Sequence, residues 1–233
     1  MKVVYNMTIS TLIVTEYGGE KMPKAFSDEE KSAIHLKLME LGNEYFGRYG
    51  FQKTSIDDIV REAGISKGAF YLFFASKEEY FFGVMDYLDH KVKIEVMKNL
   101  DVINMLPFDL FCRIIRNIFE MLLKYPVVKE ILMSGVYEQI LRKLPPEKIQ
   151  AHERDDHQFF HNVIDLLKSK GVQIKVDDDE FIKRFSYIVI PIFTKNSMTD
   201  HILDLDFDEM IEIALYFSKL LYQDLVVGEN PAS

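Results

Sequence analysis

Residues 54–77 contain the pattern that most limits how this chain can fold, namely two short helices joined by a tight turn. In the first helix, which we expect from about Thr54 to Ala63, apolar residues recur three and four positions apart. Gly64 follows, and glycine is favoured after a helix end because it tolerates left-handed backbone angles. Ser66 is placed to cap a second helix by accepting a hydrogen bond from a free amide. The stretch therefore predicts a helix-turn-helix.

A helix-turn-helix sets its second helix in the major groove of DNA. Between residues 48 and 77 the charge suits this role, with five Lys and Arg against three Asp and Glu. The whole chain, in contrast, carries a net charge of −9. Because the acidity lies mostly outside the helix pair, a small positive surface remains to meet phosphate. We therefore expect modest nonspecific affinity for DNA.

The same segment and its flanks resemble the amino-terminal domain of the TetR family of one-component regulators. The resemblance runs from about Phe26 to Phe82, roughly a quarter of the chain. A bare helix-turn-helix would be weak evidence, whereas the added block from Tyr71 to Lys77 makes the match specific. The matching blocks are Arg48-Tyr49-Gly50-Phe51, Thr54-Ser55, Ala63-Gly64-Ile65-Ser66-Lys67-Gly68, Phe70-Tyr71-Leu72-Phe73-Phe74 and Ser76-Lys77-Glu78-Glu79.

Capping boxes, in which a serine and a glutamate three residues later bond each other's backbone amides, mark two long helices. Ser27 opens the first, which we expect to end near Gly50, and Ser76 opens another that runs to about Leu100. No alternating strand pattern of useful length appears, so we predict an all-α fold. The buried stripe of the first helix is expected to consist of Ile34, Leu38, Leu41 and Tyr45. Prolines and glycines divide the remainder into helices near 108–124, 127–142, 146–170, 177–195 and 207–227.

The resemblance implies a domain organisation for most of the chain. Residues 22–75 would form a three-helix DNA-binding head with the helix-turn-helix. Residues 76–233 would form a helical domain for ligand binding and dimerisation, with residues 76–100 as the connecting helix.

The first 21 residues do not read as part of either domain. Polar residues interrupt their apolar run and no small-residue cleavage site follows, which argues against a signal peptide. Gly18-Gly19-Glu20 can be encoded by a purine-rich ribosome-binding sequence, and Met22 precedes a capped helix as in the family. We expect residues 1–21 to be a disordered or wrongly assigned leader, and the natural protein to start at Met22.

Composition limits the cellular setting. Cys112 is the single cysteine, so an internal disulfide is excluded and a reducing cytoplasm is favoured. No apolar run approaches the roughly 18 residues that a membrane span requires. We expect a cytoplasmic protein with no membrane partner.

The second helix carries the residues best suited to DNA contact. Lys67 offers a cationic donor for guanine, and Gly68 lets the helix approach the bases. Ala69 could touch a thymine methyl, while Tyr71 and Lys77 are placed for phosphate contacts that set the register. The full predicted DNA-binding set, carried over from the family, is Thr54, Ser55, Ser66, Lys67, Gly68, Ala69, Tyr71 and Lys77.

The helices beyond residue 100 are rich in Phe, Tyr and Met, which suit the walls of a pocket for an apolar or amphipathic molecule. The family resemblance implies such a pocket, and it also implies that the last two helices pair with those of a second chain. The expected pocket residues are Phe108, Phe111, Met121, Tyr125, Met133, Tyr137, Phe159 and Phe160. The expected dimer residues are Phe181, Phe185, Ile188, Val189, Ile192, Met210, Ile213, Phe217, Leu220 and Leu221.

Catalytic and metal sites have little support in the sequence. His157 and His161 are four residues apart on a helix, which could place two imidazoles on one metal, but a solvated helix face explains them equally. The stretch from Gly42 to Arg48 resembles a phosphate loop only superficially, because it lies within a helix. No catalytic pair of a nucleophile and a general base can be assigned from the sequence. We therefore expect no cofactor, no metal and no enzymatic activity, and leave open whether the two histidines bind a metal.

Together these features predict a homodimeric, ligand-responsive transcriptional regulator, a repressor released from a palindromic operator by a small apolar or amphipathic molecule. A helical architectural or division-control protein that binds DNA without an inducer is the alternative. The sequence names neither the inducer nor the operator and regulated genes, and it does not separate repressor from activator.

Overall fold

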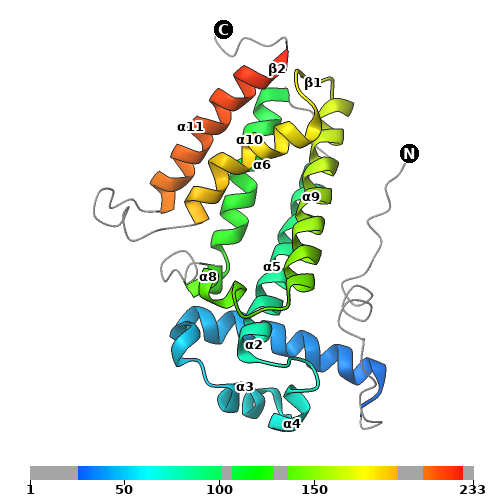
Figure 1. Cartoon of the computed structure of the whole chain (residues 1–233), viewed down its shortest axis with the longest axis vertical. Helices are drawn as coiled ribbons and strands as arrows, with labels where there is room; N and C mark the ends of the chain where they lie inside the picture. Colours follow the sequence, from blue (N-terminus) through cyan, green and yellow to red (C-terminus); the bar gives the residue numbers. More distant parts are fainter. Residues whose placement is uncertain (1–25, 101–106, 129–135, 194–206, 228–233) are drawn as a thin grey trace. The chain divides into compact units, whose positions relative to one another are not determined.

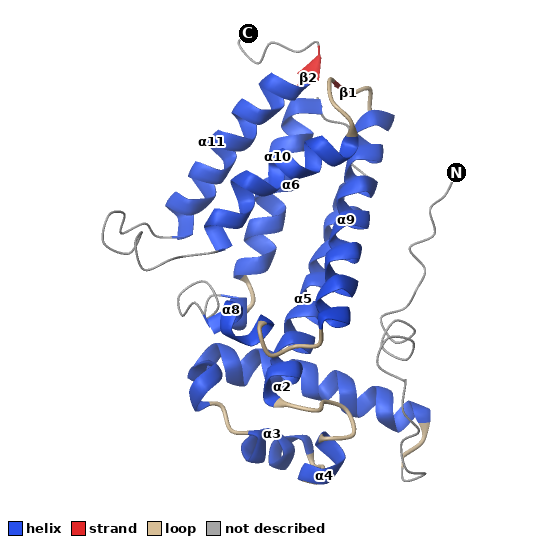
Figure 2. Cartoon of the chain, in the orientation of Figure 1, coloured by secondary structure: helices blue, strands red, loops and turns tan. Residues whose placement is uncertain are grey.

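The computed structural model describes residues 26–100, 107–128, 136–193 and 207–227, which are helical almost throughout (Figures 1 and 2). The predicted leader, residues 1–21, lies outside the described residues. The chain divides into two compact units. Unit 1 comprises Met1–Leu88 and Tyr125–Glu130, and unit 2 comprises Asp89–Lys124 and Ile131–Ser233. The division falls within helix α5, Lys77–Leu100.

Unit 1 begins with helix α2, Asp28–Lys53, and the predicted capping box at its start is confirmed. The Ser27 hydroxyl accepts a hydrogen bond from the Glu30 amide at 3.1 Å, and the Glu30 carboxylate accepts one from the Ser27 amide at 2.7 Å. The helix is broken in its last turn at Gly50, where φ is 75°. The predicted end near Gly50 therefore appears as a kink, which glycine permits because it has no Cβ.

The buried face of α2 differs from the predicted stripe. Of the four residues expected there only Leu38 is buried, and Ile34, Leu41 and Tyr45 are half-buried. The face is centred on Gly42, where an added Cβ would lie 2.3 Å from Cγ2 of Val84 on α5. Glycine gives no apolar signal, so counting hydrophobic residues misplaced the stripe. The buried residues of α2 are His35, Leu38, Met39, Gly42, Phe46 and Phe51.

Aromatic rings form most of the unit 1 core. The Phe46 ring lies 4.8 Å from that of Phe81 and 5.3 Å from that of Tyr80, and the Tyr80 ring lies 5.1 Å from that of Phe70. The Tyr80 hydroxyl donates to the Leu38 carbonyl, which satisfies its polar group within the core. Burial raises the pKa of Tyr80 above its ordinary value. These contacts join α2, the start of α5 and the segment that contains Phe70 into one head.

Unit 2 contains five helices among the described residues and one short pair of strands. Its helices are α6 (Pro107–Leu123), α8 (Val136–Leu141), α9 (Pro146–Ser169), α10 (Asp178–Phe193) and α11 (Phe207–Leu225). Helix α10 packs against both α9 and α11, and α11 also packs against α6. Of the predicted helix near 127–142, the structure has α8 and a helical turn at 126–128, and residues 129–135 lie outside the described residues. None of the helices in the described ranges is both long and apolar enough to cross a membrane.

The two strands, which the sequence did not predict, are β1 (Gln173–Ile174) and β2 (Val226–Val227). They pair antiparallel, with Gln173 opposite Val227. The last helix therefore ends at Leu225 rather than at residue 227. Two-residue strands are too short to show an alternating pattern, so the all-α prediction holds for the fold as a whole.

A network of charges ties α5 to α9 within unit 2. The Lys93 ammonium, whose side chain is 9% exposed, lies 2.5 Å from carboxylate oxygens of Asp89 and Asp156 and 2.6 Å from one of Asp155. Burial by itself would lower the pKa of Lys93, but the neighbouring carboxylates outweigh this and hold the pKa above its ordinary value. The cation therefore stays charged between the helices.

Candidate nucleic-acid interface

Helices α3 (Ile56–Ala63) and α4 (Lys67–Phe70) form the predicted helix-turn-helix (Figure 1). Gly64 ends α3 with φ 77° and ψ 28°, and its amide donates to the Val60 and Arg61 carbonyls. The Ser66 hydroxyl accepts a hydrogen bond from the Ala69 amide at 3.0 Å and so caps α4. Both predictions for this turn are confirmed.

Helix α4 is short, but hydrogen-bonded turns extend it to Phe74. Its two sides differ sharply in exposure. Lys67, Gly68 and Tyr71 are exposed, whereas Phe70 and Phe74 are buried in the core of unit 1. The exposed side is thus a small polar surface with one cation and one phenol, which is suited to contact with DNA.

Lys67 does not project freely into solvent. Its ammonium lies 2.9 Å from Oδ1 and 3.1 Å from Oδ2 of Asp57 on α3. The hydrogen bond to Asp57 raises the pKa of Lys67. An ammonium has three N–H donors, so Lys67 keeps capacity for a base edge or phosphate while the carboxylate orients it. The sequence did not reveal this pairing, because the two residues are ten positions apart.

Two residues predicted to contact DNA are turned inward instead. Thr54 is buried, and its hydroxyl donates to the Gly50 carbonyl at 2.8 Å and the Tyr45 carbonyl at 3.1 Å. It therefore closes the end of α2. Ala69 is 8% exposed and packs into the head, so its methyl is not presented to a thymine.

The other predicted contacts have mixed positions. Ser55 is half-exposed at the start of α3, and its side chain makes no capping hydrogen bond. The Lys77 ammonium donates to the Gln52 carbonyl at 3.3 Å and lies 4.6 Å from the centroid of the Phe51 ring. Burial lowers the pKa of Lys77. Leu72, which was not predicted, is exposed beside Tyr71 and belongs to the same surface.

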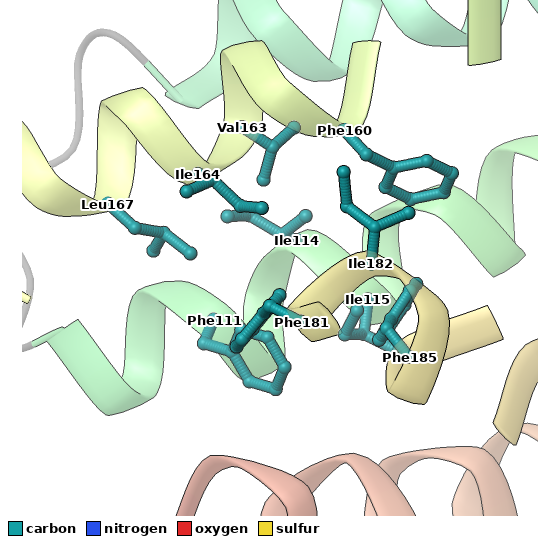
Figure 3. Close-up of a pocket in the computed structure, with 10 residues that line it drawn as sticks. All are labelled: Phe111, Ile114, Ile115, Phe160, Val163, Ile164, Leu167, Phe181, Ile182 and Phe185. Atoms are coloured by element: carbon teal, nitrogen blue, oxygen red, sulfur yellow. The ribbon is translucent and has the colours of Figure 1, made fainter. Parts of the chain in front are cut away.

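An apolar cavity lies in unit 2 among α6, α9 and α10 (Figure 3). The space between the lining atoms, counted together with the part open to solvent, is about 370 Å³, whereas the room for a water-sized molecule inside it is only about 20 Å³. Every lining side chain is a hydrocarbon, and no polar group points into the space. The lining residues are Phe111, Ile114, Ile115, Phe160, Val163, Ile164, Leu167, Phe181, Ile182 and Phe185.

Of the eight predicted pocket residues, Phe111 and Phe160 line this cavity. Phe108 packs on the ring of Tyr222 at 5.1 Å, and Phe159 is buried 5.9 Å from the Lys93 ammonium. The other four residues lie elsewhere or outside the described residues. Tyr125 belongs to unit 1, Tyr137 is half-buried on α8, and the side chain of Met121 and all of Met133 lie outside the described residues.

The residues predicted for a dimer interface separate into two groups. Phe181 and Phe185 are buried and line the cavity, because the inward side of α10 is apolar as well. Ile213, Phe217 and Leu220 are exposed, and Leu221 is half-buried. The side chains of Ile188, Val189, Ile192 and Met210 lie outside the described residues. The exposed large apolar residues of the two helices, here named the α10–α11 face, are Tyr187, Ile213, Tyr216, Phe217 and Leu220.

Histidine and carboxylate groups come within metal-ligand reach at two places in the described part of unit 2. One place surrounds the Lys93 ammonium, which already supplies the cation there. The other consists of His157, His161 and Asp179. The sequence paired the two histidines but could not show the aspartate, which belongs to the next helix.

Three comparisons bear on the identity of the chain. The family model described as bacterial regulatory proteins, tetR family, matches residues 38–84 of this chain. The uncharacterized HTH-type transcriptional regulator YfiR of Bacillus subtilis (strain 168) is 37% identical over 60 residues, which are 26% of this chain and 29% of that protein. The match thus spans less than a third of this relative's length.

Solved structures extend the likeness to both units. A TetR-family transcriptional regulator from Pectobacterium atrosepticum has a TM-score of 0.68 at 18% identity, covering 88% of this chain and 100% of that chain. The regulator FadR from Bacillus subtilis, in complex with stearoyl-CoA, has a TM-score of 0.57 at 14% identity, covering 84% of this chain and 100% of that one. At these identities the likeness concerns the fold. The match over residues 38–84 identifies this part of the chain as the DNA-binding helix-turn-helix head of the tetR family of bacterial regulatory proteins.

Proposed function

We propose that this protein is a homodimeric transcriptional repressor that leaves its operator when an apolar small molecule enters the cavity of unit 2. The observation that carries the proposal is the exposed side of α4, where Lys67, Gly68 and Tyr71 stand clear of the core. Lys67 would read a guanine edge, and Tyr71 would bond a phosphate.

The α10–α11 face supports the proposal of a dimer. Phe217 is 49% exposed and Tyr216 is 61% exposed, on a helix whose opposite side is buried. Contiguous exposed apolar side chains of this size mark an interaction surface. A second copy of the chain is the occupant that a helix-turn-helix protein needs, because two related half-sites are read by two related recognition helices.

The cavity supports an apolar ligand. Its lining offers no hydrogen-bond donor or acceptor, so recognition inside it would rest on the burial of hydrocarbon. The FadR neighbour was solved with stearoyl-CoA, a molecule with a long hydrocarbon chain. We propose that an acyl chain or a similar hydrocarbon enters between α9 and α10, while any polar headgroup stays outside.

Ligand control requires that the small molecule favour a conformation with weaker DNA affinity. A ligand that binds both conformations equally would shift nothing. We propose that entry of the hydrocarbon favours a conformation in which the two recognition helices no longer match successive major grooves.

Fluorescence anisotropy on labelled DNA from upstream of the protein's own gene tests this proposal. Saturated acyl-CoAs of increasing chain length should release the DNA, with longer chains acting at lower concentration because each buried CH₂ contributes about 0.8 kcal/mol. Val163→Phe, which fills the cavity, should leave DNA binding intact and abolish release. The same change at Val172, a buried valine that does not line the cavity, is the control for overpacking.

If the unliganded protein binds DNA from this region no better than a scrambled duplex, the proposed repressor does not act on its own gene. If it binds this DNA but no acyl-CoA releases it, the proposed ligand class is refuted and the proposal of a DNA-binding repressor is retained. If Val163→Phe and Val172→Phe respond alike, the cavity is not the ligand site.

A further inference from the structure

We propose that His157, His161 and Asp179 form a binding site for a divalent transition-metal ion of the zinc type. The site would join α9 to the start of α10 in unit 2. It goes beyond the proposed function and does not depend on it, because it concerns a separate group of side chains from the cavity lining.

The two histidines lie on one face of α9. Side chains four residues apart on a helix are neighbours, and the His157 and His161 ring centroids are 4.5 Å apart with an interplanar angle of 62°. Neutral imidazole is the most common metal ligand in proteins, and this spacing lets one helix supply two of them.

Asp179 supplies the third ligand from α10. Its Oδ1 lies 3.3 Å from Nε2 of His157 and 3.1 Å from Nε2 of His161. Asp177 fixes the backbone here, because its carboxylate accepts a hydrogen bond from the Glu180 amide at 2.9 Å. The Nε2 atoms of the two histidines on α9 thus lie close to a single carboxylate oxygen, Oδ1 of Asp179 on α10.

These separations fit a metal centre. Zinc binds nitrogen and carboxylate oxygen at about 2.0–2.2 Å, so the ligand atoms of a tetrahedral site lie roughly 3.4 Å apart. The two distances to Asp179 are already close to this value, and all three ligand atoms lie within 4.8 Å of one another. The His157 side chain is 52% exposed, so water can reach the fourth position. Binding would need only small side-chain rotations.

Hydrogen bonds from the imidazoles to the Asp179 carboxylate would give similar distances. The charged groups around the cluster therefore have to distinguish a metal site from simple hydrogen bonding. The neighbouring carboxylate of Asp178 is held by Lys168, whose ammonium lies 2.6 and 2.8 Å from its two oxygens. At Asp89, Asp155 and Asp156, the other place with histidines nearby, the Lys93 ammonium occupies the centre. Among the described residues, no lysine or arginine pairs with the Asp179 carboxylate, and imidazole with carboxylate is a ligand set that zinc, iron and nickel accept.

A metal here would act on the walls of the cavity. Phe160 and Phe181 line the cavity. His161 directly follows Phe160 in the sequence, and Asp179 lies two residues before Phe181. An ion shared by α9 and α10 would hold these two walls together, and it would stabilise the folded chain because the unfolded chain has no preformed site.

Calorimetric titration of untagged, EDTA-treated protein with zinc at neutral pH tests the site, and thermal unfolding with and without zinc supplies a second readout. We expect one zinc per chain and a raised midpoint. His161→Gln and Asp179→Asn should each lower the affinity about tenfold or more. His152→Gln, which removes another histidine from α9, should bind like the parent chain. With cobalt in place of zinc, the spectrum should show nitrogen and oxygen ligands without the thiolate band that Cys112 would give.

Absence of saturable zinc binding, or equal affinity of the parent chain, His161→Gln and Asp179→Asn, would overturn the site. Loss of zinc binding in His152→Gln alone would show that the metal binds in the charge network around Lys93. A thiolate band would show that Cys112 is a ligand. Either result would also refute the assignment made here.

Discussion

At the scale of single residues, His35 is a buried histidine in the head whose pKa is strongly shifted. It is 6% exposed and packs against the rings of Phe73 and Phe74, with centroid distances of 6.3 and 5.6 Å. Burial lowers its pKa from 6.5 to about 4. The folded chain therefore keeps this imidazole neutral at a pH where the unfolded chain protonates it.

The direction of the effect on stability follows from proton binding. Between pH 6.5 and about 4 the unfolded state binds more protons at this site, so stability falls as the pH falls. When the pH is lowered from about 7 to about 5, protonation of His35 in the unfolded chain should lower the free energy of unfolding by roughly 2 kcal/mol. Urea unfolding at these two pH values should show this loss in the parent chain and a clearly smaller one in His35→Leu. Equal losses in both chains would show that other groups carry the acid sensitivity.

The pair of Lys67 and Asp57 sets the charge that the head presents to DNA. Lys67→Ala should lower affinity for the operator about tenfold and reduce the preference over scrambled DNA. Asp57→Asn should raise affinity a few-fold at low salt, because it removes a negative charge facing phosphate and releases the lysine. Anisotropy titrations measure both, with Lys31→Ala, a lysine of α2 paired with Asp28, as the control. An unchanged affinity ratio in Lys67→Ala would show that this lysine reads no base.

At the scale of helices, Gly42 sets how closely α2 and α5 pack. A Cβ at this position would lie 2.3 Å from Cγ2 of Val84 and 2.8 Å from the Tyr80 hydroxyl. Gly42→Ala should therefore destabilise the chain by about 1–2 kcal/mol, because overpacking outweighs the higher helix propensity of alanine. Gly68→Ala is the matched control, since the nearest atom to its Cβ would be 3.8 Å away. Thermal unfolding should place Gly42→Ala below the parent and Gly68→Ala at or above it. The reverse order would contradict the close contact.

The Lys93 network predicts a large effect between α5 and α9. Lys93→Met would leave the carboxylates of Asp89, Asp155 and Asp156 together without their cation. Removing one partner of a buried ion pair typically destabilises by about 3 kcal/mol or more. Lys31→Met breaks a surface pair with Asp28 and should change stability by less than about 0.5 kcal/mol. Denaturant unfolding compares the two, and similar small effects would show that the network contributes little.

Local signals explain which elements could be predicted from the sequence. Ser27, Gly64 and Ser66 act on amides and carbonyls within a few residues, so the sequence contains the whole interaction and their roles were predicted correctly. Thr54 and Ala69 lie in the expected motif, but which way they face depends on packing against the rest of the head.

Contacts between distant segments could not be predicted in this way. The side of α10 that bears Phe181 and Phe185 is apolar whether it faces a partner or a cavity, and periodicity alone does not separate the two. Asp57 with Lys67, and Asp179 with His161, become visible only when two helices are placed side by side. The first pair sets the charge that α4 presents to DNA, and the second belongs to the proposed metal site.

At the scale of the whole molecule, each unit contributes one part of the proposed regulator. In this proposal the exposed side of α4 would contact a single half-site, and pairing of two chains through the exposed α10–α11 face would bring two heads to one operator. A single half-site contact would be weak, because the local positive charge is small. Specific binding should therefore require two chains and a DNA site with twofold symmetry.

The most direct test is to incubate the purified chain with fragmented genomic DNA of its source organism, recover the bound fragments and sequence them. We predict enrichment of a few fragments that share a pseudo-palindrome with half-sites about 10 base pairs apart or a multiple of that spacing. Gel filtration with light scattering should find two chains or a multiple of two on each site. Phe217→Glu, which places a charge on the α10–α11 face, should lose both the dimer and the enrichment. Recovery of no sequence above background, or of single half-sites bound by one chain, would contradict the account.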